Sequence, residues 1–170
     1  MRSRVRAELG AGEARVQTGL PLLDHALQLL AAHGRLDLEI DVAADADAEE
    51  VAQLGRALGE QLAAPLRAPG ARGHGSASVP ADEALALVAL EASGRPRFVS
   101  NVDLSREHVA GLATDLVSRF LQELAQGAGL TLHVRLVEGE DTRHVLDAMF
   151  KSLGATIGDA CSPPGGPQTR

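Results

Sequence analysis

The chain has 170 residues, of which 45% are hydrophobic, and a formal net charge of −7 at pH 7. Such a chain can bury a core of ordinary size, and its acidic balance argues against a nucleic-acid partner. The longest apolar run, Ala84 to Leu90, is far shorter than the roughly 20 residues of a membrane helix. One cysteine, Cys161, excludes an internal disulfide framework, and the N-terminus lacks an apolar signal core. We therefore expect a cytoplasmic protein with no membrane partner.

The first half of the chain alternates strands and helices. Gly10-Ala11-Gly12 between two short strand patterns favours a hairpin turn. Pro21 and Gly34 are start and stop signals around a wide apolar stripe, and Pro65 predicts the end of a second helix. The elements expected in this half are strands at 2–9 and 13–18, a helix at 21–34, a strand at 36–42, an acidic loop at 43–47 and a helix at 48–63.

The second half begins after a loop over residues 65–75 that is rich in Pro and Gly. The elements expected there are strands at 76–79, 83–91 and 97–102, a loop at 103–111, a helix at 112–126, a strand at 130–137 and a helix at 142–154. The last ten residues, 161–170, are rich in Pro and Gly, and we expect them to be disordered.

The last strand and helix carry the first candidate site. The alternation of the strand places His133 on one face. On the helix, Arg143 and Asp147 are four residues apart, with His144 beside them. A histidine and a carboxylate at this spacing can hold a divalent ion, but an arginine cannot ligate a cation. The alternative is a surface ion pair between Arg143 and Asp147.

A repeat connects this region with the first half. A shift of 94 residues lays 27–42 over 121–136, and with one extra residue 48–59 then falls on 143–154. The alternative is chance similarity among helices rich in Leu and Ala. The repeat predicts a two-layer α+β sandwich in one compact domain, with half-repeats at 1–76 and 77–160 and the tail at 161–170.

Five segments in register carry a resemblance to a known family: TGLPLLDHAL, AAHGRLDLEI, VPADEALALVALEASGRPRFV, LTLHVRL and HVLDAMFKSLG. From about Gly10 to Gly154 the chain resembles imidazoleglycerol-phosphate dehydratase, a manganese-dependent hydro-lyase of L-histidine biosynthesis. The resemblance implies a tandem duplication of a half-domain like the second domain of ribosomal protein S5. It also implies dehydration of imidazole glycerol phosphate to imidazole acetol phosphate, with Mn²⁺ on the ring nitrogens.

The resemblance assigns roles to individual residues, and the match to the family's motifs is partial. The implied metal ligands are His25, His133, His144, Asp147 and Glu49. Asp147 and Glu49 are also the catalytic candidates, and Lys151 and Arg72 are the candidates for binding substrate. Asp147 replaces a glutamate of the family motif, Arg143 replaces a histidine, and Ala48 and Ala52 stand at two positions of the earlier motif.

These departures lead to two functional hypotheses. The first is a dehydratase with a depleted metal site, with Mn²⁺ lost or reduced to one ion and activity weakened. The second is an inactive paralogue that acts as a structural or regulatory subunit of the active enzyme. In both, the resemblance implies a homo-oligomer built from trimers.

Overall fold

The computed structural model describes residues 3–42, 46–103, 108–109 and 112–165. The first half contains β1 (Arg4–Leu9), β2 (Ala14–Gln17), α1 (Pro21–Gly34), β3 (Leu36–Asp41) and α2 (Ala48–Leu66). The second half contains β4 (His74–Ala81), β5 (Ala84–Glu91), β6 (Arg97–Ser100), β7 (His108–Val109), β8 (Leu112–Ala113), α3 (Asp115–Ala128), β9 (Thr131–Glu138) and α4 (Thr142–Cys161).

The two main sheets share one pairing pattern. In the first sheet, with strand order β1-β3-β2, the central strand β3 is antiparallel to β1 and parallel to β2. In the second, with order β4-β5-β9-β6, β9 is antiparallel to β5 and parallel to β6. The expected α+β class is confirmed.

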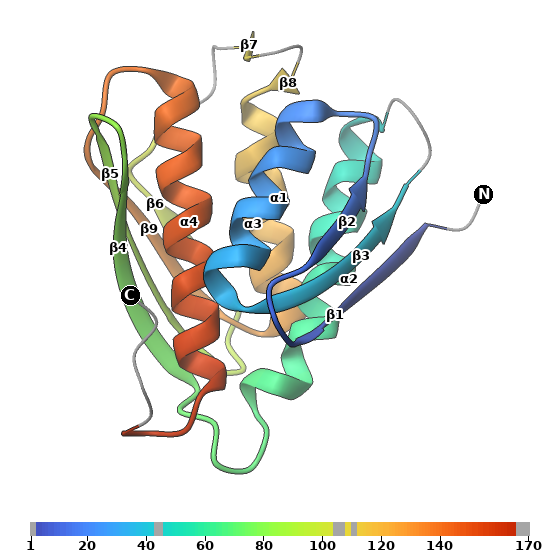
Figure 1. Cartoon of the computed structure of the whole chain (residues 1–170), viewed down its shortest axis with the longest axis vertical. Coiled ribbons are helices and arrows are strands. Elements are labelled where there is room, and N and C mark those ends of the chain that lie inside the picture. The colour runs from blue at the N-terminus through green and yellow to red at the C-terminus, as the bar shows by residue number, and fades with distance from the viewer. Residues whose placement is uncertain (1–2, 43–45, 104–107, 110–111, 166–170) are drawn as a thin grey trace.

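The helices form a layer between these two sheets, and all four begin at the same end of the molecule (Figure 1). Helices α1 and α2 pack on the first sheet, while α3 and α4 pack on the second. Each half thus has a sheet and its helices as the predicted two layers, and the helices of the two halves pack against each other between the sheets.

The predicted hairpin between the first two strands is wrong. Strands β1 and β2 do not pair with each other, because β3 lies between them. The connecting loop is instead fixed by the Asp37 carboxylate, whose Oδ1 accepts the backbone N–H groups of Ala11, Gly12 and Glu13 at 3.0 Å each. These bonds lower the pKa of Asp37 below its usual value, with the N–H of Glu13 as the largest cause.

Two predicted helix ends are also wrong. Helix α2 continues through Pro65 to Leu66, because a proline in the last turn removes only a terminal hydrogen bond. Helix α4 continues past Gly154 to Cys161, and every residue from Ser152 to Cys161 is buried. The tail was expected to begin at Cys161, yet this residue ends α4, and residues 166–170 lie outside the described part of the chain.

Two of the close backbone contacts between the helices of the two halves are equivalent in the repeat. A Cβ added to Gly154 of α4 would lie 2.3 Å from the carbonyl oxygen of Leu30 of α1. A Cβ added to Gly59 of α2 would lie 2.4 Å from the carbonyl oxygen of Leu124 of α3. In the repeat alignment Gly59 falls on Gly154 and Leu30 on Leu124. The same contact therefore occurs twice, with the halves exchanged.

Candidate functional site

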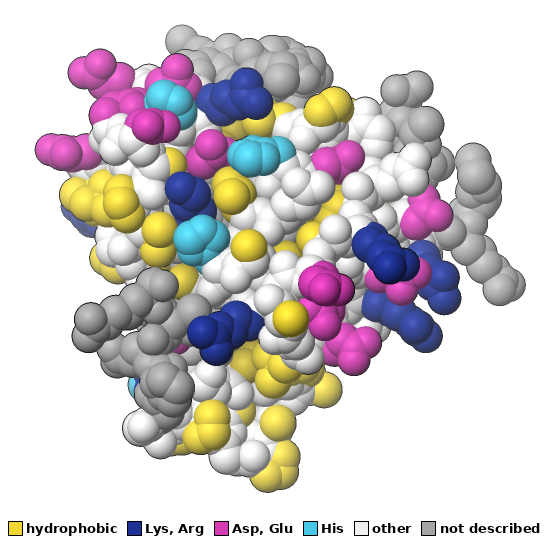
Figure 2. All heavy atoms as spheres, in the orientation of Figure 1, with side chains coloured by type: hydrophobic (Ala, Val, Ile, Leu, Met, Phe, Trp, Pro, Cys, Tyr) yellow, Lys and Arg dark blue, Asp and Glu magenta, His cyan; other side chains and the backbone are white. Residues whose placement is uncertain are grey.

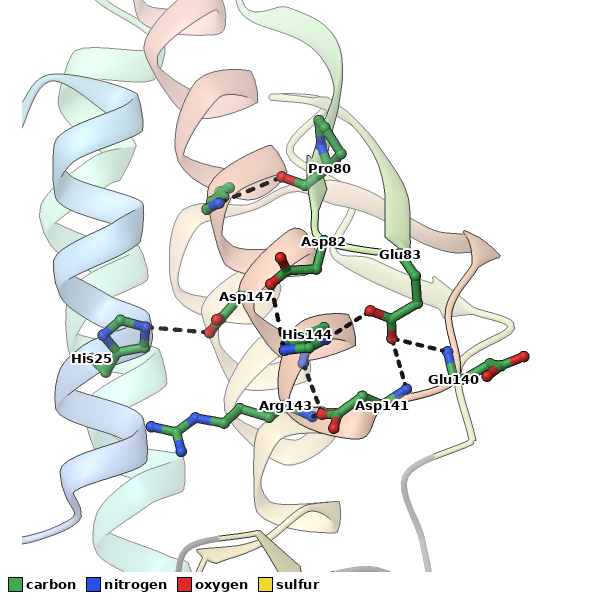
Figure 3. Close-up of polar contacts among 10 residues, drawn as sticks. His25, Pro80, Asp82, Glu83, Glu140, Asp141, Arg143, His144 and Asp147 are labelled. Atoms are coloured by element: carbon green, nitrogen blue, oxygen red, sulfur yellow. Dashed lines mark hydrogen bonds and ion pairs between the residues drawn. The ribbon is translucent and has the colours of Figure 1, made fainter.

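The first turns of α1 and α4 lie side by side and bring together two of the predicted ligands. His25 Nε2 of α1 lies 3.4 Å from Asp147 Oδ1 of α4 (Figure 3). Asp141 fixes the start of α4, since its Oδ1 accepts the N–H groups of Arg143 at 2.9 Å and His144 at 3.3 Å. We call His25, His144 and Asp147 the α1/α4 end.

The surface ion pair considered for Arg143 and Asp147 is not formed. Asp147 faces His25, and Arg143 has no carboxylate of a described residue within 4.0 Å. The Arg143 side chain extends from α4 in the direction of α1 (Figure 3). Lys151, two turns further along α4, lies 3.4 Å from the carbonyl oxygen of Pro80 and likewise has no ion pair with a described residue.

His144 is held by the turn between β4 and β5. Its Nδ1 lies 2.7 Å from Glu83 Oε2, and its Nε2 lies 3.4 Å from Asp82 Oδ2. Glu83 Oε1 also accepts the N–H of Asp141 at 2.9 Å and that of Glu140 at 3.4 Å. Asp82 and Glu83 lie in the segment VPADEALALVALEASGRPRFV, which carries part of the family resemblance, but no role was predicted for them. Two carboxylates in a two-residue turn between alternating strands were the signal that could have found them.

These contacts shift two pKa values in opposite directions. The N–H of Asp141 and then the His144 ring lower the pKa of Glu83 to about 2, because both stabilise the carboxylate. The same hydrogen bond to Glu83 raises the pKa of His144. Further along α1, burial and then the charge of Lys151 lower the pKa of His33.

His133 and Arg72 lie elsewhere, at a groove of about 850 Å³ along the second sheet. His133 is exposed on β9 between Ala89 of β5 and Val99 of β6. None of the residues of the α1/α4 end lines this groove. His133 and Arg72 thus line one groove, and His133 is separated from the other predicted ligands.

Glu49 lies in the first turn of α2, where Arg119 of α3 pairs with it at 3.0 Å. A second ion pair, Arg56 with Glu123 at 2.8 Å, joins the same helices. In the repeat alignment Glu49 corresponds to His144 and Arg119 to His25. We call Glu49 and Arg119 the α2/α3 end.

The residue types of the α1/α4 end suit a divalent ion, since imidazole nitrogen and carboxylate oxygen are ligands of Mn²⁺ and Zn²⁺. Among the described residues, however, no group of three His, Cys, Asp or Glu side chains could hold a metal. One chain supplies the pair His25 and Asp147 with His144 nearby. Figure 2 shows histidines and carboxylates gathered over the upper parts of α4 and α1.

Residues 18–157 of the chain match the family model of imidazoleglycerol-phosphate dehydratase. The chain belongs to this family. Among its relatives, the imidazoleglycerol-phosphate dehydratase of Acetivibrio thermocellus is 39% identical over 155 residues, which cover 89% of this chain and 80% of that protein. The enzyme of Moorella thermoacetica is also 39% identical, over 89% of this chain and 79% of its own.

Solved structures of dehydratases share this architecture. The Staphylococcus aureus imidazoleglycerol-phosphate dehydratase superposes with a TM-score of 0.88 at 29% identity, covering 95% of this chain and 94% of that one. The Pyrococcus furiosus enzyme gives a TM-score of 0.81 at 27% identity, covering 96% and 91%. The match confirms the resemblance seen in the sequence and the mixed fold of four helices and two main sheets. Among the described residues, no helix is long and apolar enough to cross a bilayer.

Proposed function

We propose that this chain dehydrates imidazole glycerol phosphate to imidazole acetol phosphate in L-histidine biosynthesis. The observation that carries the proposal is the family match over 18–157, which contains every candidate site residue. Within it, His25, Asp147 and His144 come together at the α1/α4 end. The matched proteins named above are dehydratases, and none of the observations favours an inactive subunit. A cytoplasmic location stays a prediction.

The metal content follows from the contrast between the two ends. We infer one Mn²⁺ per chain at the α1/α4 end. His25 and Asp147, with His144 nearby, would supply part of its ligands, and a neighbouring copy of the chain would supply the rest. At the α2/α3 end an arginine engages Glu49, so a second ion would have to displace this pair. A depleted site of this kind is consistent with weakened activity. When bound, Mn²⁺ would act as a Lewis acid toward the imidazole ring of the substrate.

The chain's own residues would position the substrate and move a proton. Lys151 and Arg72 are the proposed partners of the substrate phosphate, since charge-assisted hydrogen bonds to phosphate are strong. Arg72 lies at the groove that His133 also lines, so a neighbouring copy of the chain would supply it. Asp147 is the proposed general base, because its carboxylate is half-buried beside His25. Glu49, the second catalytic candidate, would first have to leave Arg119.

We further propose that the site is completed between copies of the chain in a homo-oligomer built from trimers. His133 is the proposed contribution of a neighbouring copy, because in one chain it lies on the outer face of the second sheet. That face supports a contact between copies, since it exposes Leu87 and Val99. The first sheet has charged neighbours on its outer face instead, with Arg6 and Arg15 both beside Glu39.

We propose that the two halves arose by tandem duplication of a half-domain like the second domain of ribosomal protein S5. Two observations support this origin: the shared strand pairing of the two sheets and the repeated contact of Gly154 with Leu30 and of Gly59 with Leu124. The half-repeat limits at 1–76 and 77–160 remain predictions.

The test combines metal analysis, a dehydration assay and sedimentation. Purified protein saturated with Mn²⁺ and then freed of excess ion should retain about one ion per chain. It should also convert imidazole glycerol phosphate and sediment as a multiple of three chains. Protein that retains no metal and shows no turnover with added Mn²⁺ would contradict the activity, and a monomer under all conditions would contradict the shared site.

A further inference from the structure

The turn between β4 and β5 is the best-defined polar feature near the α1/α4 end. Ala81 pairs with Ala84, so only Asp82 and Glu83 connect the strands. Asp82 has a φ of 50°, a left-handed conformation that tight hairpin turns require and that Asp tolerates better than most residues. The turn therefore fixes the backbone from which both carboxylates reach His144.

Both oxygens of Glu83 are engaged, each with a different partner. Oε1 accepts the N–H of Asp141 at 2.9 Å, and Oε2 lies 2.7 Å from His144 Nδ1 (Figure 3). An ionised carboxylate only accepts hydrogen bonds. The hydrogen of the short contact must therefore belong to Nδ1 of the ring.

Among the described residues, the other ring nitrogen has no comparable partner. Asp82 Oδ2 lies 3.4 Å from Nε2, longer than the 2.7–3.2 Å of a good N–H to O hydrogen bond. The side chain of His144 is 34% exposed, so solutes can reach it. The ring is thus anchored through Nδ1 and open at Nε2.

We propose that Glu83 is a positioning residue that holds neutral His144 as the Nδ1–H tautomer, with the lone pair of Nε2 directed outward. The ring orientation follows from the contacts above, while the use of the lone pair as a metal ligand rests on the proposed function. A histidine ligand whose second ring N–H donates to a carboxylate is more basic and keeps one orientation.

Replacing Glu83 by Gln gives a specific expectation, because the amide keeps the shape but changes one acceptor into a donor. Its oxygen must stay on the N–H of Asp141, since two donors cannot bond to each other. The NH₂ group then faces His144 Nδ1 and can bond only to a lone pair. Glu83→Gln should therefore convert neutral His144 to the Nε2–H tautomer. The outward nitrogen, Nε2, would then carry a proton and could not ligate a metal.

The test is ¹⁵N NMR of the imidazole rings in metal-free protein, at a pH above the raised pKa of His144. His144→Gln assigns the signal. The wild type and the matched control Asp82→Asn should show Nδ1–H, and Glu83→Gln should show Nε2–H. Asparagine tolerates the left-handed turn, so the control keeps the backbone.

Mn²⁺ titration of the same proteins then separates this inference from the proposed function. Glu83→Gln should weaken Mn²⁺ binding by about 10–100-fold, as changes behind a ligand do. The wild type as Nε2–H, or a Glu83→Gln protein that keeps Nδ1–H, would overturn the role of Glu83. The expected tautomers without Mn²⁺ binding by the wild type would uphold the role of Glu83 and count against the proposed metal site. If Glu83→Gln does not fold, the tautomer of the wild type alone decides.

Discussion

The α1/α4 and α2/α3 ends occupy equivalent places in the two halves and differ in how their charges are balanced. At the α2/α3 end both bridging cations are paired within the chain, Arg119 with Glu49 and Arg56 with Glu123. At the α1/α4 end Arg143 and Lys151 have no carboxylate partner among the described residues, and the bridge is His25 with Asp147. The polar groups of the α2/α3 end are thus engaged in ion pairs within the chain, whereas the α1/α4 end keeps cationic groups without such partners.

This contrast supports the proposal that one half of the scaffold carries the site while the other half is structural. The helix contacts that support the two ends are the same, since Gly154 meets Leu30 as Gly59 meets Leu124. The two ends therefore differ in their side chains near the helix N-termini and not in the backbone contacts between the helices.

The largest expected effect is on metal binding. Asp147→Asn should weaken Mn²⁺ binding by at least about 100-fold, because it removes a charged ligand. Replacing a residue that only supports a ligand costs about 10–100-fold, and the loss of the ligand itself should cost more. Glu49→Gln, the matched change at the α2/α3 end, should alter the affinity by less than about 2-fold, well under 1 kcal/mol. Titration calorimetry measures both. Equal losses in the two variants would show that the ends are alike.

The next effect is on stability and should be similar in the two halves. Gly154→Ala and Gly59→Ala should each lower the free energy of unfolding by about 1–3 kcal/mol through overpacking. This loss exceeds the roughly 0.5–1 kcal/mol that alanine gains over glycine in a helix. Urea denaturation gives the values, with Gln61→Ala on the exposed side of α2 as the control. A stable variant at either glycine would show that the two helix contacts are not equivalent.

A smaller loss of stability is expected from breaking the ion pair between Arg56 of α2 and Glu123 of α3. Glu123→Gln should cost about 0.2–1 kcal/mol of unfolding free energy, because Arg56 and Glu123 are a partly exposed pair. The loss should shrink in 1 M salt, where charges are screened beyond about 3 Å. Urea denaturation at low and high salt measures it. A loss of several kcal/mol that does not depend on salt would mean that Glu123 acts through packing.

The smallest expected effect is a change in acid sensitivity at the open end. The pKa of Glu83 is lowered in the folded protein to about 2 from an ordinary 4.5, so its contribution to stability is present above pH 4.5. That contribution is lost as the pH falls from 4.5 toward 2. Unfolding free energy should therefore fall less steeply in Glu83→Gln than in the wild type over this range. Parallel profiles from urea denaturation would argue against the contacts of Glu83 with the N–H of Asp141 and with His144.

Local patterns predicted most of the secondary structure. Helix α1 has the predicted limits because Pro21 and Gly34 are local start and stop signals. Strand β3 was predicted to within one residue at its end. The pairing of β1 and β2 was missed, since inserting β3 between them is a decision made by distant residues. The end of α4 was missed because burial against the second sheet extends the helix beyond Gly154.

For the candidate site, too, local spacing predicted some features and tertiary packing decided the others. Sequence spacing was enough to select His144 and Asp147 as neighbours on one helix. The contact of Asp147 with His25 needed the packing of α1 on α4, and the hold on His144 needed the β4–β5 turn to approach from 61 residues away. No local pattern links Glu83 with His144.

Residue identity and local periodicity were enough to predict the family and the order of most elements. The packing of the two halves places the helices between two sheets, pairs Arg119 with Glu49 and separates His133 from His25. The physical reason is that such contacts depend on which backbone surfaces pack together, and packing joins residues that no local pattern connects.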